Sequence, residues 1–265
     1  MKTIKLDKRS IYLRQIVLSC VTKKGRGHIG PALSMIEILR VLYDSILKNK
    51  NGQRDRFILS KGHGCLGLYA ILYDKGLIKK KYLDEFGTNK SILGGHPEHF
   101  IPGVEFSTGA LGHGYPIASG VAKALRLKKK NNLVFCLLGD GEINEGSVWE
   151  SALSVTKHNL NNLITMIDYN KMQSYDFNKT VLNLEPLAKK WKSFGFNVLE
   201  SNGHDIQDIK KKILLAKKSS RPPLIIFHTI KGRGIKSAEN NRFWHHKSNL
   251  KKEELVKITE ELNNQ

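Results

Sequence analysis

The sequence predicts an α/β fold: a doubly wound, mainly parallel sheet with helices on both faces. The run LVFCLLG at 133–139 is apolar throughout, as expected of a strand buried on both sides. Three later apolar runs have strand character, NLITMIDYN, FNVLE and PLIIFHTIK, and segments with helical spacing separate them. Strands that alternate with helices in this way usually form a parallel sheet.

The first half of the chain fits the same scheme. A helix is expected over 7–23, ending at a glycine cluster, and a second over 32–47, after Pro31. A short strand at 57–59 leads through two glycines into a third helix. Residues 87–116 form a long Gly-, Pro- and His-rich segment without periodicity, which is typical of a functional loop. No linker or repeat is apparent, so residues 1–265 are expected to form one domain.

Composition narrows the class of protein. The net charge is +20, but the lysines occur as pairs and triplets at segment edges, and neither zinc-finger spacing nor interleaved aromatic residues accompany them. We therefore expect no nucleic acid as partner. No apolar run reaches about 18 residues, so no membrane span is expected. The charged start does not resemble a secretory signal, and three widely spaced cysteines indicate reduced thiols in the cytoplasm.

The stretch GDGEINEG at 139–146 follows the first of these strands and precedes a helical pattern. Asp140 ends one apolar run and Asn170 ends the next, with 29 residues between them, enough for one helical crossover. If the strands are neighbours, the two side chains and a nearby carbonyl could hold Mg²⁺, and a diphosphate would complete its oxygen shell. The alternative is that these carboxylates only cap a helix.

Together with IDYNKMQ, this stretch resembles the thiamine diphosphate motif, which begins Gly-Asp-Gly and ends at an asparagine. KGRGHIGPALS, ILSKGHGCLGLYA, LGGHPE and FSTGALGHGYPIASGVA resemble successive segments of transketolases. The resemblance covers about residues 10–247 and implies the thiamine-diphosphate-binding fold. It implies that Asp140, Asn170 and the carbonyl of Met172 bind the metal, Mg²⁺ or Ca²⁺. The other cofactor-binding positions that it implies are His63, Gly109, Leu111, Gly139, Gly141 and Glu145, the last bridging the cofactor sites of two subunits.

Histidines form a second group. A lone histidine is most often a surface or core residue, but five of these lie in glycine-rich or loop sequence, where imidazoles can orient hydroxyls and relay protons. The resemblance implies that His28 and His96 contact the ketose near its first carbons. It implies that His245 contacts substrate and transfers protons. Two positions depart from the family pattern: His246 replaces a glycine, and His113 stands where many relatives carry glutamine.

Two further segments carry predictions of their own. Trp149, Ala152, Leu153 and Val155 are expected on the core face of a helix. The basic, glycine-rich stretch at 231–241 is expected to be either a mobile loop that closes over phosphates or a plain surface loop.

In transketolases the glutamate that activates the cofactor belongs to a second, pyrimidine-binding domain, and a third domain follows. This chain matches only the first, diphosphate-binding domain. The resemblance therefore implies half an enzyme, the amino-terminal subunit of a split transketolase. A carboxy-terminal subunit would carry the glutamate in an α2β2 heterotetramer. Such an enzyme moves a two-carbon ketol group from a ketose phosphate to an aldose phosphate. Alternatives are a subunit like 1-deoxyxylulose-5-phosphate synthase or an oxo-acid dehydrogenase, or a non-catalytic cofactor-binding subunit.

Overall fold

A five-stranded, entirely parallel sheet forms the centre of the computed structural model, which describes residues 4–24, 27–50, 53–245, 247, 250 and 252–264. Across the sheet the strands are β3 (Arg56–Leu59), β4 (Val134–Gly139), β5 (Leu163–Tyr169), β7 (Pro223–His228) and β6 (Asn197–Asn202). A two-stranded antiparallel hairpin, β1 (Asn49–Lys50) and β2 (Gln53–Arg54), precedes β3. All the strands expected from the sequence are present.

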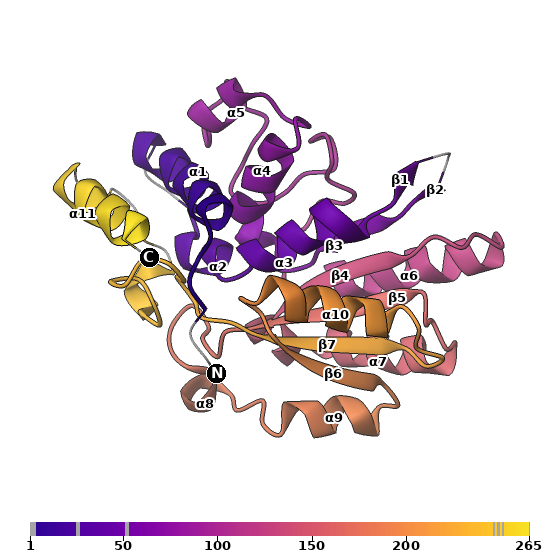
Figure 1. The fold of residues 1–265 in the computed structure, drawn as a ribbon. Helices are drawn as coiled ribbons and strands as arrows, with labels where there is room; N and C mark the ends of the chain where they lie inside the picture. The colour runs from indigo at the N-terminus through magenta and orange to yellow at the C-terminus, as the bar shows by residue number, and fades with distance from the viewer. Residues whose placement is uncertain are drawn as a thin grey trace.

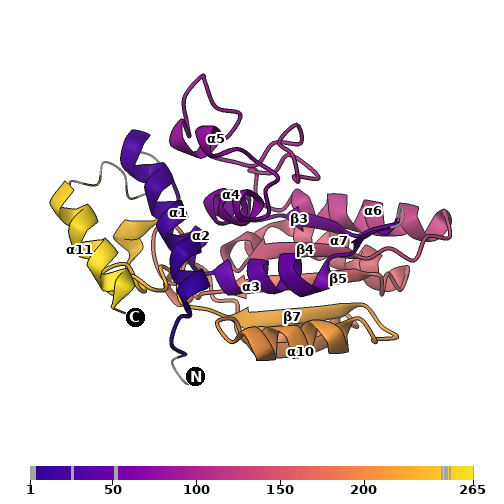
Figure 2. The ribbon, with the colours of Figure 1, turned by 45° about the horizontal axis from the view of Figure 1, so that its top comes forward.

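Helices cover both faces of this sheet, so the doubly wound arrangement is confirmed (Figures 1 and 2). One core cluster joins the sheet to α1 (Lys8–Lys24), α2 (Ile29–Leu33), α3 (Ile36–Val41), α4 (Cys65–Asp74) and α10 (Ile206–Ala216). The opposite cluster includes α6 (Gly114–Leu127), α7 (Gly146–Lys157) and α9 (Leu187–Ser193). The shorter or peripheral helices are α5 (Lys80–Asp84), α8 (Asn178–Val181) and α11 (Lys252–Asn263). A π-helical turn, Leu42–Ile46, and three 3₁₀ turns, Gly62–Gly64, Gly141–Asn144 and Arg242–Trp244, complete the helical elements.

The two-sided burial explains why the strands are apolar without alternation. Successive side chains of a strand point to opposite faces. On β4, Phe135 and Leu137 enter the cluster with α1–α4 and α10, whereas Cys136 and Leu138 enter the cluster with α6, α7 and α9. Both faces of this strand therefore need apolar residues.

The helix expected over 32–47 is wrong in its bounds. The chain is already helical at Ile29, so Pro31 lies inside the first turn, and the helix breaks at Met35, whose backbone leaves the helical region (φ −110°, ψ 9°). Ser34, beside this break, donates a hydrogen bond to Asp168 Oδ2 at the end of β5 (2.5 Å). The break in the helix therefore coincides with a contact to a distant strand, and local sequence spacing does not reveal such a contact.

The core face of α7 also differs in one position from the prediction. Ala152 and Val155 are fully buried and Trp149 stacks on Trp191 (5.0 Å between ring centroids), but Leu153 is 59% exposed. Val148, Ala152 and Val155 instead follow the helical period of one face.

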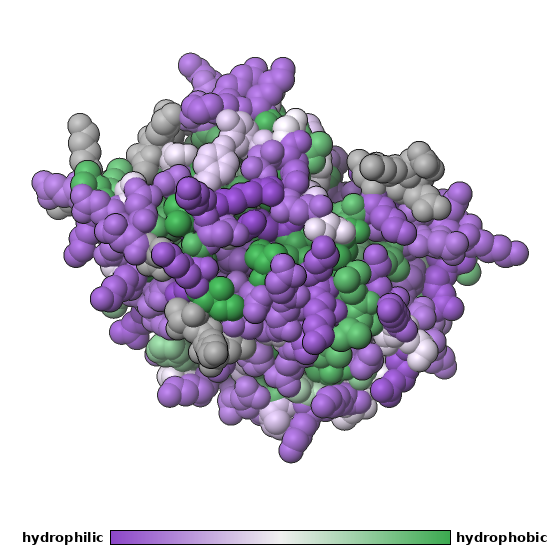
Figure 3. Space-filling view, in the orientation of Figure 1, coloured by the Kyte–Doolittle hydropathy of each residue, from purple (hydrophilic) through white to green (hydrophobic). Residues whose placement is uncertain are grey.

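The surface is mostly hydrophilic, and apolar side chains gather only in small groups on the face in Figure 3. The three cysteines are buried, and none of them forms a disulfide. Within the ranges that the structure describes, no helix is both long enough and apolar enough to cross a membrane.

Replacing Leu137 by Ala should lower the free energy of unfolding by about 2–5 kcal/mol, because it leaves a cavity at a fully buried position of the sheet. The control is Leu127→Ala at the end of α6, where the side chain is 76% exposed and a change of about 0.5 kcal/mol or less is expected. Urea denaturation of both variants measures the difference. Equal losses would contradict the assignment of Leu137 to the core.

Candidate functional site

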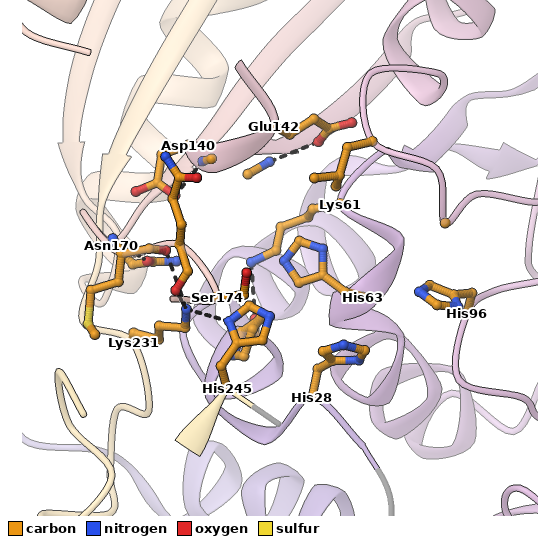
Figure 4. A pocket seen from close by; sticks show the side chains of 17 residues that line it. His28, Lys61, His63, His96, Asp140, Glu142, Asn170, Ser174, Lys231 and His245 are labelled. Atoms are coloured by element: carbon orange, nitrogen blue, oxygen red, sulfur yellow. Dashed lines mark hydrogen bonds between the residues drawn. The ribbon is translucent and has the colours of Figure 1, made fainter. Parts of the chain in front are cut away.

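A pocket lies at the carboxyl edge of the sheet, where β4 and β5 end (Figure 4). Parallel α/β sheets commonly bind ligands at this edge. Most residues selected from the sequence line it, namely His28, His63, His96, Gly109, Leu111, Gly139, Asp140, Gly141, Asn170, Met172 and His245. Residues that the sequence analysis did not select also line it: Pro31, Lys61, Glu142, Gln173, Ser174 and Lys231.

The pairing of β4 with β5 brings Asp140 and Asn170 together. Gly139 and Asp168 are partners in the register, so each of the two polar residues follows the end of its own strand at the same edge. Asp140 accepts hydrogen bonds from the backbone N–H groups of Gly141 (2.8 Å) and Lys171 (2.5 Å). Asn170 accepts one from the N–H of Met172 (3.1 Å). These bonds fix both side chains at the pocket wall.

Asp140 has the electrostatics of a carboxylate that lacks a counter-ion. It is 2% exposed, and no salt bridge reaches it from any residue that the structure describes. Burial, reinforced by the negative charge of Asp168, raises the pKa of Asp140 to about 6. A divalent cation would stabilise the ionised form. One carboxylate, one amide oxygen and a carbonyl form a set of hard oxygen donors of the kind that Mg²⁺ and Ca²⁺ prefer, so the residues present fit such an ion.

Four histidines meet across the pocket from this oxygen-rich wall (Figure 4). The ring centroid of His28 lies 5.8 Å from His63, 5.9 Å from His96 and 5.4 Å from His245. Desolvation, together with the charge of nearby Lys61, holds the pKa of His63 well below its usual value. His63 is therefore a neutral imidazole at physiological pH, able to donate and accept hydrogen bonds.

Two buried lysines were missed by the sequence analysis. Lys61 pairs with Asp168 and donates to the carbonyl of Pro31 (3.1 Å). Lys231 donates to the carbonyl oxygens of Gln173 (2.8 Å) and Met172 (3.3 Å), and its Nζ lies 2.6 Å from His245 Nδ1. Burial lowers the pKa of Lys231 to about 8. Lys61 follows the end of β3 by two residues and Lys231 follows the end of β7 by three, and each precedes a glycine. Other lysines of the chain, such as Lys75, also precede a glycine, so this local feature does not single out the two.

The stretch at 231–241 is not a plain surface loop, so that expectation is wrong, whereas the alternative of a mobile loop that closes over phosphates stays a prediction. Lys231, Arg233, Ile235 and Ala238 are buried. Gly232 adopts a positive φ of 79°, and a Cβ there would lie 2.4 Å from the carbonyl oxygen of Ala238. The segment is folded tightly on itself beneath the pocket.

Three other predicted positions lie elsewhere. Glu145 is exposed, does not line the pocket and directly precedes α7. His113 is exposed before α6, with Nδ1 3.1 Å from the carbonyl oxygen of Leu111. His246 lies outside the described residues.

The pocket also fits an anionic group beside the oxygen donors of Asp140, Asn170 and Met172. Nε2 of Gln173 is a buried donor that has no hydrogen-bond partner in the part of the chain that the structure describes. A Cβ at Gly141 would lie 3.0 Å from Cγ of this glutamine, so glycine keeps the wall of the pocket open. Together with the ammonium groups of Lys61 and Lys231, this donor suits the oxygens of a diphosphate.

Comparisons with known proteins agree with this geometry. The family described as "Transketolase, thiamine diphosphate binding domain" matches residues 7–264. An apulose-4-phosphate transketolase subunit from Actinobacillus succinogenes is 41% identical over 240 residues, covering 88% of this chain and 87% of that protein. The 6-deoxy-6-sulfo-D-fructose transketolase subunit SqwG of a Clostridium species is 35% identical over 266 residues, covering 98% of this chain and 94% of that protein.

Solved structures give the same result for the fold. The transketolase of Campylobacter jejuni superposes with a TM-score of 0.88 at 31% identity. The match covers 97% of this chain but only 43% of the Campylobacter chain, so this chain spans less than half of that enzyme's length. The pocket, the fold and these matches lead to one conclusion: the chain belongs to the transketolase family and carries its thiamine diphosphate-binding domain.

Proposed function

We propose that this chain is the amino-terminal, diphosphate-binding subunit of a two-chain transketolase. The enzyme would transfer a two-carbon ketol group from a ketose phosphate to an aldose phosphate. The observation that carries the proposal is the meeting of Asp140, Asn170 and the Met172 carbonyl with a cluster of histidines in one pocket. The three oxygen donors suit a metal ion that carries a diphosphate, and the histidines suit the hydroxyl groups of a sugar.

In this proposal the oxygen-rich wall holds the cofactor. Asp140 and Asn170, with the carbonyl of Met172, would bind Mg²⁺ or Ca²⁺, while the glycine turn and the pocket lysines would receive the diphosphate. Leu111 and Gly109 also line the pocket. Leu111 would offer an apolar contact to the rest of the cofactor, and Gly109, which has no side chain, would let the cofactor approach the backbone. Thiamine diphosphate, when bound, supplies the carbon nucleophile that protein side chains lack.

The histidines would bind the sugar. His28, His96 and His245 lie in one cluster with the neutral His63, so they can orient adjacent hydroxyl groups. Nδ1 of His245 lies 2.6 Å from Nζ of Lys231, and this contact fixes the position of the ring at the pocket. We propose that His245 takes up and returns a proton of a substrate hydroxyl, a role that needs a neutral imidazole.

A companion chain would complete the site. Two relatives that match this chain over nearly their whole length are named as subunits. We propose that the companion carries the activating glutamate and that two copies of each chain form an α2β2 heterotetramer. The exposed side chain of Glu145, just outside the pocket, is available to a neighbouring protomer. We also propose a cytoplasmic location and a role in pentose phosphate metabolism; the free cysteines are consistent with a reducing compartment.

Replacing Asp140 by Ala should abolish Mg²⁺-dependent binding of thiamine diphosphate, because the only carboxylate of the proposed donor set is lost. Isothermal titration with Mg²⁺ and with EDTA measures the binding. The matched control is Asp84→Ala in the peripheral helix α5, which should bind like the wild type. Metal-dependent binding that survives in the Asp140 variant would refute the metal role.

The chain alone should show no ketol transfer, since the activating glutamate is expected on the companion. Adding the companion, thiamine diphosphate and Mg²⁺ should produce transfer from a ketose phosphate to an aldose phosphate. Chromatography of the sugar products measures this transfer. The companion can be found by affinity capture of this chain from its native cell. Turnover by the chain without any companion would disprove the half-enzyme proposal.

A further inference from the structure

Outside the pocket, three charged or titratable side chains from distant parts of the chain form one buried network. Arg14 comes from α1, Glu37 from α3 and His204 from the turn before α10, and their side chains are 0%, 2% and 5% exposed. The two terminal guanidinium nitrogens of Arg14 donate to the carboxylate of Glu37, at 2.6 and 2.9 Å. The charge of Arg14 and the bond from His204 hold the pKa of Glu37 far below its usual value despite its burial.

The hydrogen bonds of His204 define its tautomer. The backbone N–H of Ile230 donates to Nε2 (2.9 Å), so this nitrogen carries no proton. Nδ1 then carries the proton and donates to Glu37 Oε2 (2.9 Å). The carboxylate therefore selects the tautomer that can accept from the backbone of Ile230.

The network ends on the short segment that carries Lys231. His204 holds the N–H of Ile230 on one side of this lysine, and Arg14 Nε donates to the carbonyl of Arg233 on the other (2.7 Å). Close packing supports the second contact, because Gly234 has a φ of 99° and a Cβ there would lie 2.9 Å from Cδ of Arg14. The lysine between these two anchors is 1% exposed and reaches the pocket wall at Gln173 and Met172.

Stability by itself does not require this network. A buried ion pair often contributes no more to stability than well-packed apolar residues of the same volume. Apolar residues, however, could neither accept from the N–H of Ile230 nor donate to the carbonyl of Arg233. The polar network thus supplies side-chain hydrogen bonds to the backbone on both sides of Lys231, which apolar residues could not form.

We propose that Arg14, Glu37 and His204 are positioning residues that hold the backbone at 230–233, so that Lys231 stays at the floor of the cofactor pocket. This proposal rests on the proposed function in one respect, that Lys231 receives the diphosphate. The positioning itself can be tested without any cofactor.

The decisive variant is Glu37→Gln in the full chain, because Glu37 does not touch the 230–233 segment. Whichever way the amide is turned, its NH₂ group faces an N–H donor of Arg14 or of His204, so one anchor is weakened. Lysine acylation with acetic anhydride, quantified by mass spectrometry, reports the exposure of Lys231. We expect its labelling to rise about tenfold, as for a locally opened segment.

One further signal and three further variants make the test specific. Lys61, also buried in the pocket but held by Asp168, should keep its wild-type labelling. His204→Leu should expose Lys231 as Glu37→Gln does, whereas His204→Gln, which retains an acceptor for the N–H of Ile230, should restore much of the protection. Glu105→Gln, which removes another arginine-paired carboxylate, should change neither lysine.

The outcomes separate the two proposals. Unchanged labelling of Lys231 in Glu37→Gln overturns the positioning proposal, as does an equal rise at Lys61, which would mean general loosening. If His204→Leu does not fold, Glu37→Gln decides alone. Failure of the wild-type chain, together with its companion, to bind thiamine diphosphate in a separate titration would count against the proposed function and leave the labelling result intact.

Discussion

The parallel pairing of β4 with β5 is the constraint on which the rest of the site depends. Their register ends with Gly139 opposite Asp168, and β5 continues for one more residue, Tyr169, beside β7, so Asp140 and Asn170 each follow the end of a strand at the same edge. Asp140 and Asn170 become neighbours for that reason, although 29 residues separate them in sequence. A shift of one residue in this pairing would turn the side chains of one strand to the opposite face of the sheet, so Asp140 and Asn170 would no longer face the same pocket.

Buried charge gives this edge its chemistry. Asp168 and Lys61 neutralise each other, and Ser34 and Thr229 add hydrogen bonds to the same carboxylate. Asp140, one strand away, forms no salt bridge with a residue that the structure describes, and its pKa is raised to about 6. Of the two neighbouring aspartates, one therefore maintains the structure and the other is available to a cation. This difference is what makes the edge suitable for a metal-bound anion.

The side of the pocket that carries Lys231 and His245 depends on packing that extends well beyond the pocket. Lys231 and His245 belong to the last third of the chain, yet they meet histidines of the first half because the 230–233 segment is held against α1 and α3. The backbone N–H of Gly232 also donates to the carbonyl of Gly30, which joins this segment directly to α2, just after His28. The substrate-facing and cofactor-facing parts of the pocket are thus fixed by a common framework.

The sequence by itself determined the strands, the parallel topology and most of the pocket lining. Continuous apolar runs and glycine turns depend on local chemistry, and the family motifs are local as well. Lys61, Lys231 and Glu142 could not be selected this way, because their burial results from long-range contacts; in a sequence rich in lysine, nothing local marks two of them as buried. The packed state of 231–241, the exposure of Leu153 and the break at Met35 were likewise decided only by tertiary structure. At Ser34 and in the 231–241 segment a distant element supplied the contact, whereas Leu153 lies off the helical face that Val148, Ala152 and Val155 turn to the core.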